Sequence, residues 1–81
     1  MLTPLQEAQV RFVGAKQVLR ALSAGQLKCA YVARDADPFV TRRVIDACDK
    51  AKLPCHEVDT MQELGKACRI DVGAAAAAVG K

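Results

Sequence analysis

Aromatic residues are scarce in this chain of 81 residues, which contains only Phe12, Tyr31 and Phe39 and no tryptophan. Fifteen residues are alanine, so the core must be built from small aliphatic side chains in closely spaced layers. Such a core does not suggest a roomy, aromatic-lined pocket. A chain of 81 residues is also too short for two cores, because domains below about 40 residues usually need disulfides or metals. We therefore expect residues 1–81 to form one domain.

Signals for export, membrane insertion and metal binding are also missing. No run approaches the roughly 18 consecutive apolar residues of a membrane span, and the N-terminus lacks the basic and apolar regions of a signal peptide. The four cysteines form no C-x-x-C pair, and the lone His56 directly follows Cys55. We expect buried thiols rather than a zinc site or disulfides, and we place the protein in the cytoplasm.

The residues that could support catalysis are isolated from one another. Ser23 and His56 fall on separate predicted elements, which gives no nucleophile with an adjacent base. Asp35 and Asp37 have no partner nucleophile, and we expect them to cap helices. The sequence therefore predicts no enzyme, no catalytic residue and no cofactor.

Capping residues and apolar spacing predict four helices. Asp37-Pro38 is the firmest boundary, because aspartate caps a helix and proline suits its first position. Gly25 is expected to end the preceding helix in a left-handed conformation, and Thr60 with Glu63 three residues later predicts a capping box at the start of the last helix. The predicted helices cover residues 3–10, 15–24, 38–52 and 61–67.

Apolar runs predict strands over residues 27–33, 55–58 and 74–78, and a short apolar stretch covers residues 11–13. The last strand is a run of five alanines, which favour helix intrinsically. The run is too short for an isolated helix, and a central strand of alanines allows helices to approach a sheet closely. We predict an α/β fold, a three-layer α-β-α sandwich with about four strands in a mixed sheet between helices.

Residues 14–20 carry the first candidate binding site. Lys16, Gln17 and Arg20 share one face of a helix that begins after Gly14. Like charges four residues apart destabilise a helix, and a cation in its first turn opposes the helix dipole, so a bound polyanion would relieve both costs. The net charge of +3 fits such a partner without establishing one. The alternative is an ordinary solvated helix face.

A second candidate is the loop formed by residues 69–73. Its two aliphatic residues, Ile70 and Val72, are expected to be exposed and suit packing against a nucleic-acid base. The alternative is that one of them folds back under the sheet, which we favour for Val72 and leave open for Ile70.

Four segments in order and spacing resemble the L7Ae and L30e ribosomal protein family, in its short bacterial branch. These segments are GAKQxxR at 14–20, ARDADP at 33–38, LGKAC at 64–68 and IDVGAAA at 70–76. The resemblance implies an α-β-α sandwich that binds the RNA kink-turn, a bent element with sheared G·A pairs and a bulge. It implies these RNA-binding residues: Gly14, Ala15, Lys16, Gln17, Arg20, Asp37, Ile70, Asp71, Val72 and Gly73.

The same resemblance implies a role for each part of the site. Gly14 would lie against RNA backbone, Asp37 would lie near the flipped nucleotide of the bulge, and the loop with Ile70 and Val72 would stack on unpaired bases. Arg20 falls on a family lysine. Lys16 and Gln17 fall where most relatives carry Asn and Glu that recognise guanine edges, so this chain exchanges a carboxylate acceptor for attraction to phosphate.

The expected partner is a structured RNA with a kink-turn, in the ribosome or another ribonucleoprotein, bound by a monomer that does not contact membranes. General principles agree, because proteins gain specificity for RNA at bulges and distorted pairs whose bases are splayed out. The alternative function is a protein-interaction module that uses Ile70, Val72 and Phe39 as an apolar patch without RNA. Salt dependence separates the two, because RNA binding weakens log-linearly with salt.

Overall fold

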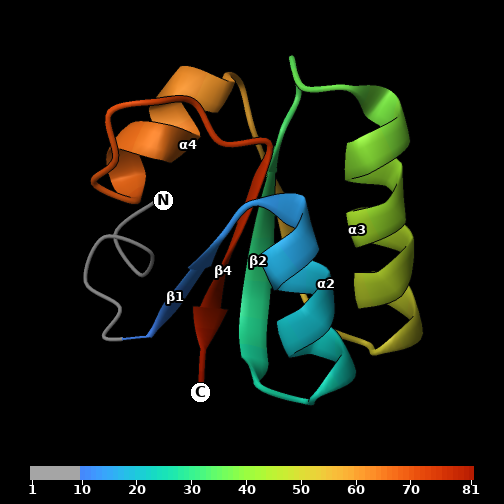
Figure 1. Ribbon diagram of the computed structural model, residues 1–81. Coiled ribbons are helices and arrows are strands. Elements are labelled where there is room, and N and C mark those ends of the chain that lie inside the picture. Colours follow the sequence, from blue (N-terminus) through green and yellow to red (C-terminus); the bar gives the residue numbers. More distant parts are fainter. Residues whose placement is uncertain (1–9) are drawn as a thin grey trace.

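The computed structural model describes residues 10–81, which form a four-stranded mixed sheet with helices on both faces (Figure 1). The elements in chain order are β1 (Arg11–Val13), α2 (Ala15–Ser23), β2 (Leu27–Ala33), α3 (Pro38–Lys50), β3 (Cys55–Val58), α4 (Met61–Ala67) and β4 (Ala76–Gly80). Helices α2 and α3 cover one face, and α4 covers the other. The predicted α/β sandwich is confirmed. The helix predicted for residues 3–10 lies outside the described residues, apart from Val10.

The alanine-rich strand β4 lies inside the sheet, whose strand order is β1-β4-β2-β3. It pairs antiparallel with β1 and β2, while β2 and β3 are parallel. The strand was predicted over residues 74–78 but spans Ala76–Gly80. Five identical side chains carry no pattern that could set its limits, which are fixed instead by pairing with its neighbours. Just before it, the Ala75 carbonyl still accepts the Ala33 N–H of β2 at 2.9 Å, but the Ala74 N–H turns to α4 and donates to the Met61 carbonyl at 3.0 Å.

The small side chains of β4 let both helical layers approach the sheet. Ala77 and Val79 belong to the cluster under α4, and Ala76 and Ala78 belong to the cluster under α2 and α3. Each helix contributes fully buried aliphatic side chains, such as Leu64 of α4. The prediction of a core of small aliphatics is therefore confirmed.

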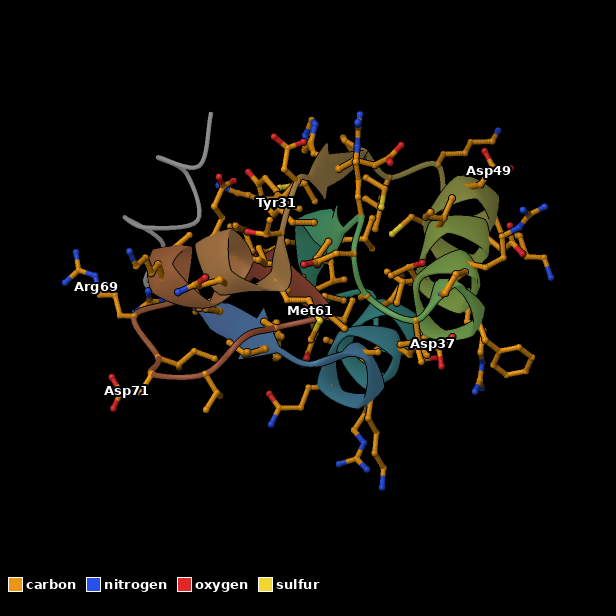
Figure 2. All side chains as sticks on the ribbon, turned by 90° about the horizontal axis from the view of Figure 1, so that it is seen from above. Tyr31, Asp37, Asp49, Met61, Arg69 and Asp71 are labelled. Atoms are coloured by element: carbon orange, nitrogen blue, oxygen red, sulfur yellow. The ribbon has the colours of Figure 1, made fainter. Side chains whose placement is uncertain are left out.

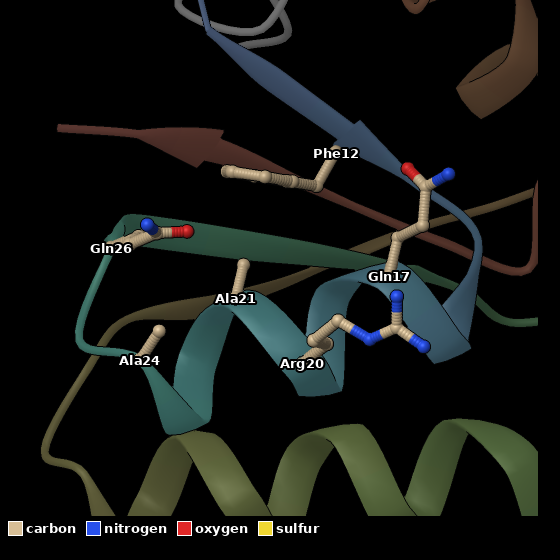
Figure 3. A pocket seen from close by; sticks show the side chains of 6 residues that line it. All are labelled: Phe12, Gln17, Arg20, Ala21, Ala24 and Gln26. Atoms are coloured by element: carbon tan, nitrogen blue, oxygen red, sulfur yellow. The ribbon is translucent and has the colours of Figure 1, made fainter.

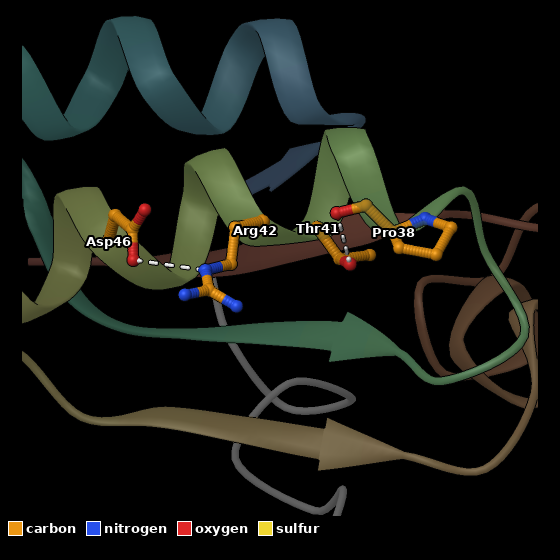
Figure 4. A network of polar contacts seen from close by, with 4 residues as sticks. All are labelled: Pro38, Thr41, Arg42 and Asp46. Carbon is orange, nitrogen blue, oxygen red and sulfur yellow. Dashed lines mark hydrogen bonds and ion pairs between the residues drawn. The ribbon is translucent and has the colours of Figure 1, made fainter.

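Both predicted capping sites occur in the structure. Asp37 accepts a hydrogen bond from the Phe39 N–H at 2.9 Å, and Thr60 accepts one from the Glu63 N–H at 3.0 Å. The α3 surface also carries an Arg42–Asp46 ion pair at 3.6 Å, with the Thr41 hydroxyl donating to the Pro38 carbonyl at 3.3 Å (Figure 4). Helix α3 ends two residues before its predicted limit and α2 one residue before.

The helices within residues 10–81 are too short or too polar to span a bilayer. The four cysteines are free thiols, with Cys48 and Cys68 buried. Burial raises the pKa of the Cys55 thiol from 9.0 to about 12, and the neighbouring Cys48 adds to the rise. Within the same residues, no three His, Cys, Asp or Glu side chains come together in a way that could hold a metal ion.

Candidate nucleic-acid interface

The N-terminus of α2 is open to solvent, and the residue that precedes the helix has a backbone conformation that requires glycine. Gly14 has φ 94° and ψ 144°, a region that residues with a side chain rarely adopt. Nothing lies within 4 Å of the position that a Cβ would occupy at this residue. Gly14 is anchored on its other side, where its N–H donates to the Ala76 carbonyl at 2.8 Å. A large ligand can therefore approach this backbone closely.

The first turn of α2 has no side-chain cap and no acidic residue. The first hydrogen bond of the helix runs from the Val18 N–H to the Gly14 carbonyl. The N–H groups before it, those of Ala15, Lys16 and Gln17, have no acceptor among the described residues. Free N–H groups of this kind attract anions.

The exposed face of α2 carries the three predicted polar residues. Lys16, Gln17 and Arg20 are exposed, whereas Val18 on the opposite face is fully buried. No carboxylate of residues 10–81 forms an ion pair with Lys16 or Arg20. The Gln17 side chain lies at the edge of β1, where its Oε1 is 3.4 Å from the Val13 nitrogen. The predicted division of the helix into a polar and an apolar face is confirmed.

Gln17 and Arg20 also border a shallow cleft of about 450 Å³ between α2 and the sheet (Figure 3). Phe12 and Ala21 supply its apolar surface, and Gln26 closes the end opposite Gln17.

In the loop after α4, Ile70 packs inward and Val72 is exposed, so the preference for a buried Val72 was wrong. Val72 is 70% exposed, whereas Ile70 is half-buried and packs against the core cluster under α4. The cause is the helix end: Arg69 adopts φ 63°, and the Ile70 N–H donates to the Gly65 carbonyl at 3.1 Å. This is a Schellman motif, in which the second residue beyond the cap residue, here Cys68, packs back on the last turns of the helix.

Glycines hold the loop tightly against α4. A Cβ at Gly65 would collide with the Val72 carbonyl, and one at Gly73 would lie 3.0 Å from the Met61 Cβ. An open cleft of about 630 Å³ remains beside the loop. It is lined by Asp35, Met61, Gln62, Lys66 and residues 70–73.

The predicted site residues gather at one end of the sheet. The start of α2, the start of α3 and the loop before β4 all lie in the upper half of Figure 1, at the end of the sheet where β1 and β2 end and β4 begins. These segments carry Gly14, Asp37 and residues 70–73. Viewed from above, Met61 lies between Asp37 and Asp71 (Figure 2). We call residues 14–20, Asp37 and residues 70–73 together the upper surface.

Both aspartates of the turn before α3 cap helices, as predicted. Asp37 caps α3, and Asp35 accepts a hydrogen bond from the Met61 N–H of α4 at 2.7 Å. No local pattern in the sequence indicates the second bond, because its partners are 26 residues apart. Phe39, in the first turn of α3 next to Asp37, is 76% exposed. The sequence predicts it only as part of an apolar patch for a protein partner.

A family model described as "Ribosomal protein L7Ae/L30e/S12e/Gadd45 family" matches residues 2–81. The chain belongs to this family. Its resemblance to the family, inferred from four short segments, is thereby confirmed. An RNA-binding protein from Geobacillus sp. (strain WCH70) is 49% identical to the chain over 67 residues, which are 83% of this chain and 82% of that protein. RNA-binding protein YbxF from Geobacillus stearothermophilus is 46% identical over 67 residues, with the same coverage of each chain.

Solved structures share the family fold. The Giardia lamblia 15.5kD RNA binding protein matches with a TM-score of 0.92 at 26% identity, over 99% of this chain and 70% of that one. A Bacillus halodurans C protein of unknown function matches with a TM-score of 0.86 at 24% identity, over 99% of this chain and 83% of that one, and supports the fold alone.

Proposed function

We propose that this protein binds RNA through its upper surface, and that the RNA element it recognises is a kink-turn. The observation that carries the proposal is the meeting of three features at one end of the sheet: the open backbone at Gly14, the exposed cations of α2 and the exposed Val72 loop. The family supports it, because relatives 49% and 46% identical to this chain are named RNA-binding proteins.

A kink-turn suits this surface better than a continuous duplex does. A-form RNA hides its base edges in a deep groove, whereas bulges and distorted pairs display them. The α2 face and the Val72 loop belong to different segments at the same end of the sheet, so together they suit a bent target. A straight helix would meet the polar face of α2 without using the aliphatic loop.

The residues of the upper surface divide into three roles under this proposal. Lys16 and Arg20 attract phosphates, helped by the free N–H groups of the first turn. Gln17 has both a donor and an acceptor and contacts base edges. Val72 packs against unpaired bases, while Ile70 holds the loop on α4.

The protein-interaction alternative has less surface available than the sequence suggested. Ile70 packs inward, so the loop offers only Val72 as an exposed aliphatic residue. We propose a monomeric, non-catalytic binding protein that works in the cytoplasm on the RNA of a ribosome or another ribonucleoprotein.

A gel-shift titration against two RNAs tests the proposal. One RNA holds a kink-turn with tandem sheared G·A pairs, and the other replaces the bulge and G·A pairs by a continuous duplex. We expect the kink-turn to bind more tightly by about 4 kcal/mol, roughly a thousandfold in Kd. Affinity for it should also fall log-linearly with salt. Equal affinity for both RNAs contradicts kink-turn recognition, and a lack of salt dependence contradicts phosphate contact.

A further inference from the structure

The upper surface is made of segments far apart in the chain, and its geometry depends on what holds them together. Asp37 belongs to the turn between β2 and α3, whereas Val72 belongs to the loop between α4 and β4. The Met61 N–H donates a hydrogen bond to the Asp35 carboxylate and so joins the turn before α3 to the start of α4, 26 residues further along the chain. Its length of 2.7 Å is short for a bond from a backbone N–H.

Met61 connects Asp35 to the loop before β4 through its own backbone. It is the first residue of α4, so its N–H has no partner inside the helix and depends on Asp35. Its carbonyl accepts the Ala74 N–H at 3.0 Å. Its Cβ packs so closely on Gly73 that a Cβ added to this glycine would lie only 3.0 Å away. A chain of direct contacts therefore runs from Asp35 through Met61 to the end of the Val72 loop.

Helix α4 keeps another cap when Asp35 is lost. Thr60 accepts the Glu63 N–H at 3.0 Å, and the Leu64 side chain is fully buried beneath the helix. Loss of the Asp35 carboxylate should therefore leave α4 folded and free Met61, with the end of the loop that is bonded to it, to move relative to the turn before α3. The link fixes position more than it holds the fold together.

We propose that Asp35 is a positioning residue, whose bond to Met61 fixes the Val72 loop relative to the RNA-contacting residues around Asp37 and α2. This inference rests on the proposed function. Asp35 does not need to touch RNA, because it acts through the backbone of Met61. An exposed carboxylate at this place repels phosphate, so a purely electrostatic role and the positioning role predict opposite signs.

Asp35→Ala removes the acceptor, and Asp35→Asn keeps an acceptor oxygen while removing the charge. We expect Asp35→Ala to weaken kink-turn binding about tenfold, since residues that touch neither ligand can alter coupling to this degree. Asp35→Asn should bind within about twofold of the parent or more tightly. If both variants bind more tightly, the carboxylate acts through its charge and the proposal is wrong. If Asn weakens binding as much as Ala, the acceptor oxygen is not the feature that matters, and the proposal is wrong as well.

Thr60→Ala is the matched control, because it removes the other cap of α4 without touching the link. Thermal melts should show a similar loss of stability in Thr60→Ala and Asp35→Ala, but Thr60→Ala should bind RNA within about twofold of the parent. Equal losses of affinity in both variants would mean that any weakening of α4 suffices, which overturns a specific role for Asp35.

Hydrogen exchange in the free protein tests the link without RNA. The Ala74 amide, bonded to the Met61 carbonyl, should exchange at least about fivefold faster in Asp35→Ala and at the parental rate in Asp35→Asn. Unchanged exchange in Asp35→Ala contradicts the link. If the parent binds no kink-turn, the proposed function fails, and the exchange rates still decide whether Asp35 positions the loop.

Discussion

The Ile70 N–H donates to the Gly65 carbonyl at 3.1 Å, so the second residue beyond α4's terminal cap residue is bonded back into its last turn. Arg69, which lies between the cap residue Cys68 and Ile70, adopts a left-handed conformation with φ 63°. The same arrangement ends the other two described helices, with Lys52 at φ 59° after α3 and Gly25 at φ 70° after α2. Only one of the three left-handed positions is occupied by glycine.

Replacement of Lys52 by glycine should therefore stabilise the fold. A left-handed conformation costs a residue with a side chain about 1 kcal/mol, part of which the greater freedom of glycine in the unfolded chain offsets. We expect Lys52→Gly to raise the free energy of unfolding by about 0.5 kcal/mol in urea titrations. Arg43→Gly, in the middle of the same helix, is the control and should lower it by about 0.7 kcal/mol. A loss of stability in both variants would contradict the argument.

These helix ends show what the sequence can and cannot predict. Gly25 was correctly predicted as a left-handed cap because glycine marks such positions. Arg69 and Lys52 carry no such mark, so the Schellman motif after α4 was missed. That motif decides that Ile70 packs inward and Val72 points out, the reverse of our preference.

The layers of the fold were predictable because caps and apolar spacing are local signals. Asp37-Pro38 and Thr60 set the starts of α3 and α4 correctly. The limits of β4 could not be predicted, because the identical alanines carry no pattern and pairing with β1 and β2 sets where the strand begins. The bond from Met61 to Asp35 was also beyond local reasoning, since only the folded chain brings these residues together.

Ile70 and Val72 should separate stability from binding. Val72→Ala removes an exposed side chain, so the free energy of unfolding should change by less than about 0.5 kcal/mol while kink-turn affinity falls. Ile70→Ala removes half-buried apolar area and should cost about 1–2 kcal/mol of stability. Urea melts and gel shifts on the same samples measure both. Unchanged affinity in Val72→Ala would show that the loop does not contact RNA.

Arg20 and Gln17 should differ in their effect on salt dependence. Arg20→Ala should weaken binding and reduce the slope of log affinity against log salt by about one unit, because one phosphate contact is lost. Gln17→Ala should keep the slope but lose discrimination between sheared G·A pairs and Watson–Crick pairs. Arg42→Ala, an exposed cation of α3 outside the upper surface, is the control and should leave the slope unchanged. An equal change of slope in Arg42→Ala would indicate nonspecific attraction.

The Cys55 thiol should make the fold sensitive to alkaline pH. Burial and the neighbouring Cys48 raise its pKa from 9.0 to about 12, so the unfolded chain releases this proton at lower pH than the folded one. The stability linked to Cys55 is complete below pH 9 and is lost as pH rises from 9 to about 12. Urea titrations should show a smaller decline over this range in Cys55→Val. An identical decline in both proteins would assign the effect to other groups.

Gly14 and Gly25 offer a matched pair for testing close approach of RNA to the backbone. Both have positive φ, and nothing lies within 4 Å of the position of a Cβ at either. Alanine at either position therefore strains the backbone without a clash inside the protein, at a cost of about 1–3 kcal/mol. We expect thermal melts to show a loss of stability in both variants, but kink-turn binding to be lost only in Gly14→Ala, because its Cβ occupies space that RNA backbone would fill. Gly25 lies at the opposite end of α2, and its variant should bind normally once folded. If Gly14→Ala remains folded and binds as tightly as Gly25→Ala, RNA docks elsewhere and the upper surface is not the binding site.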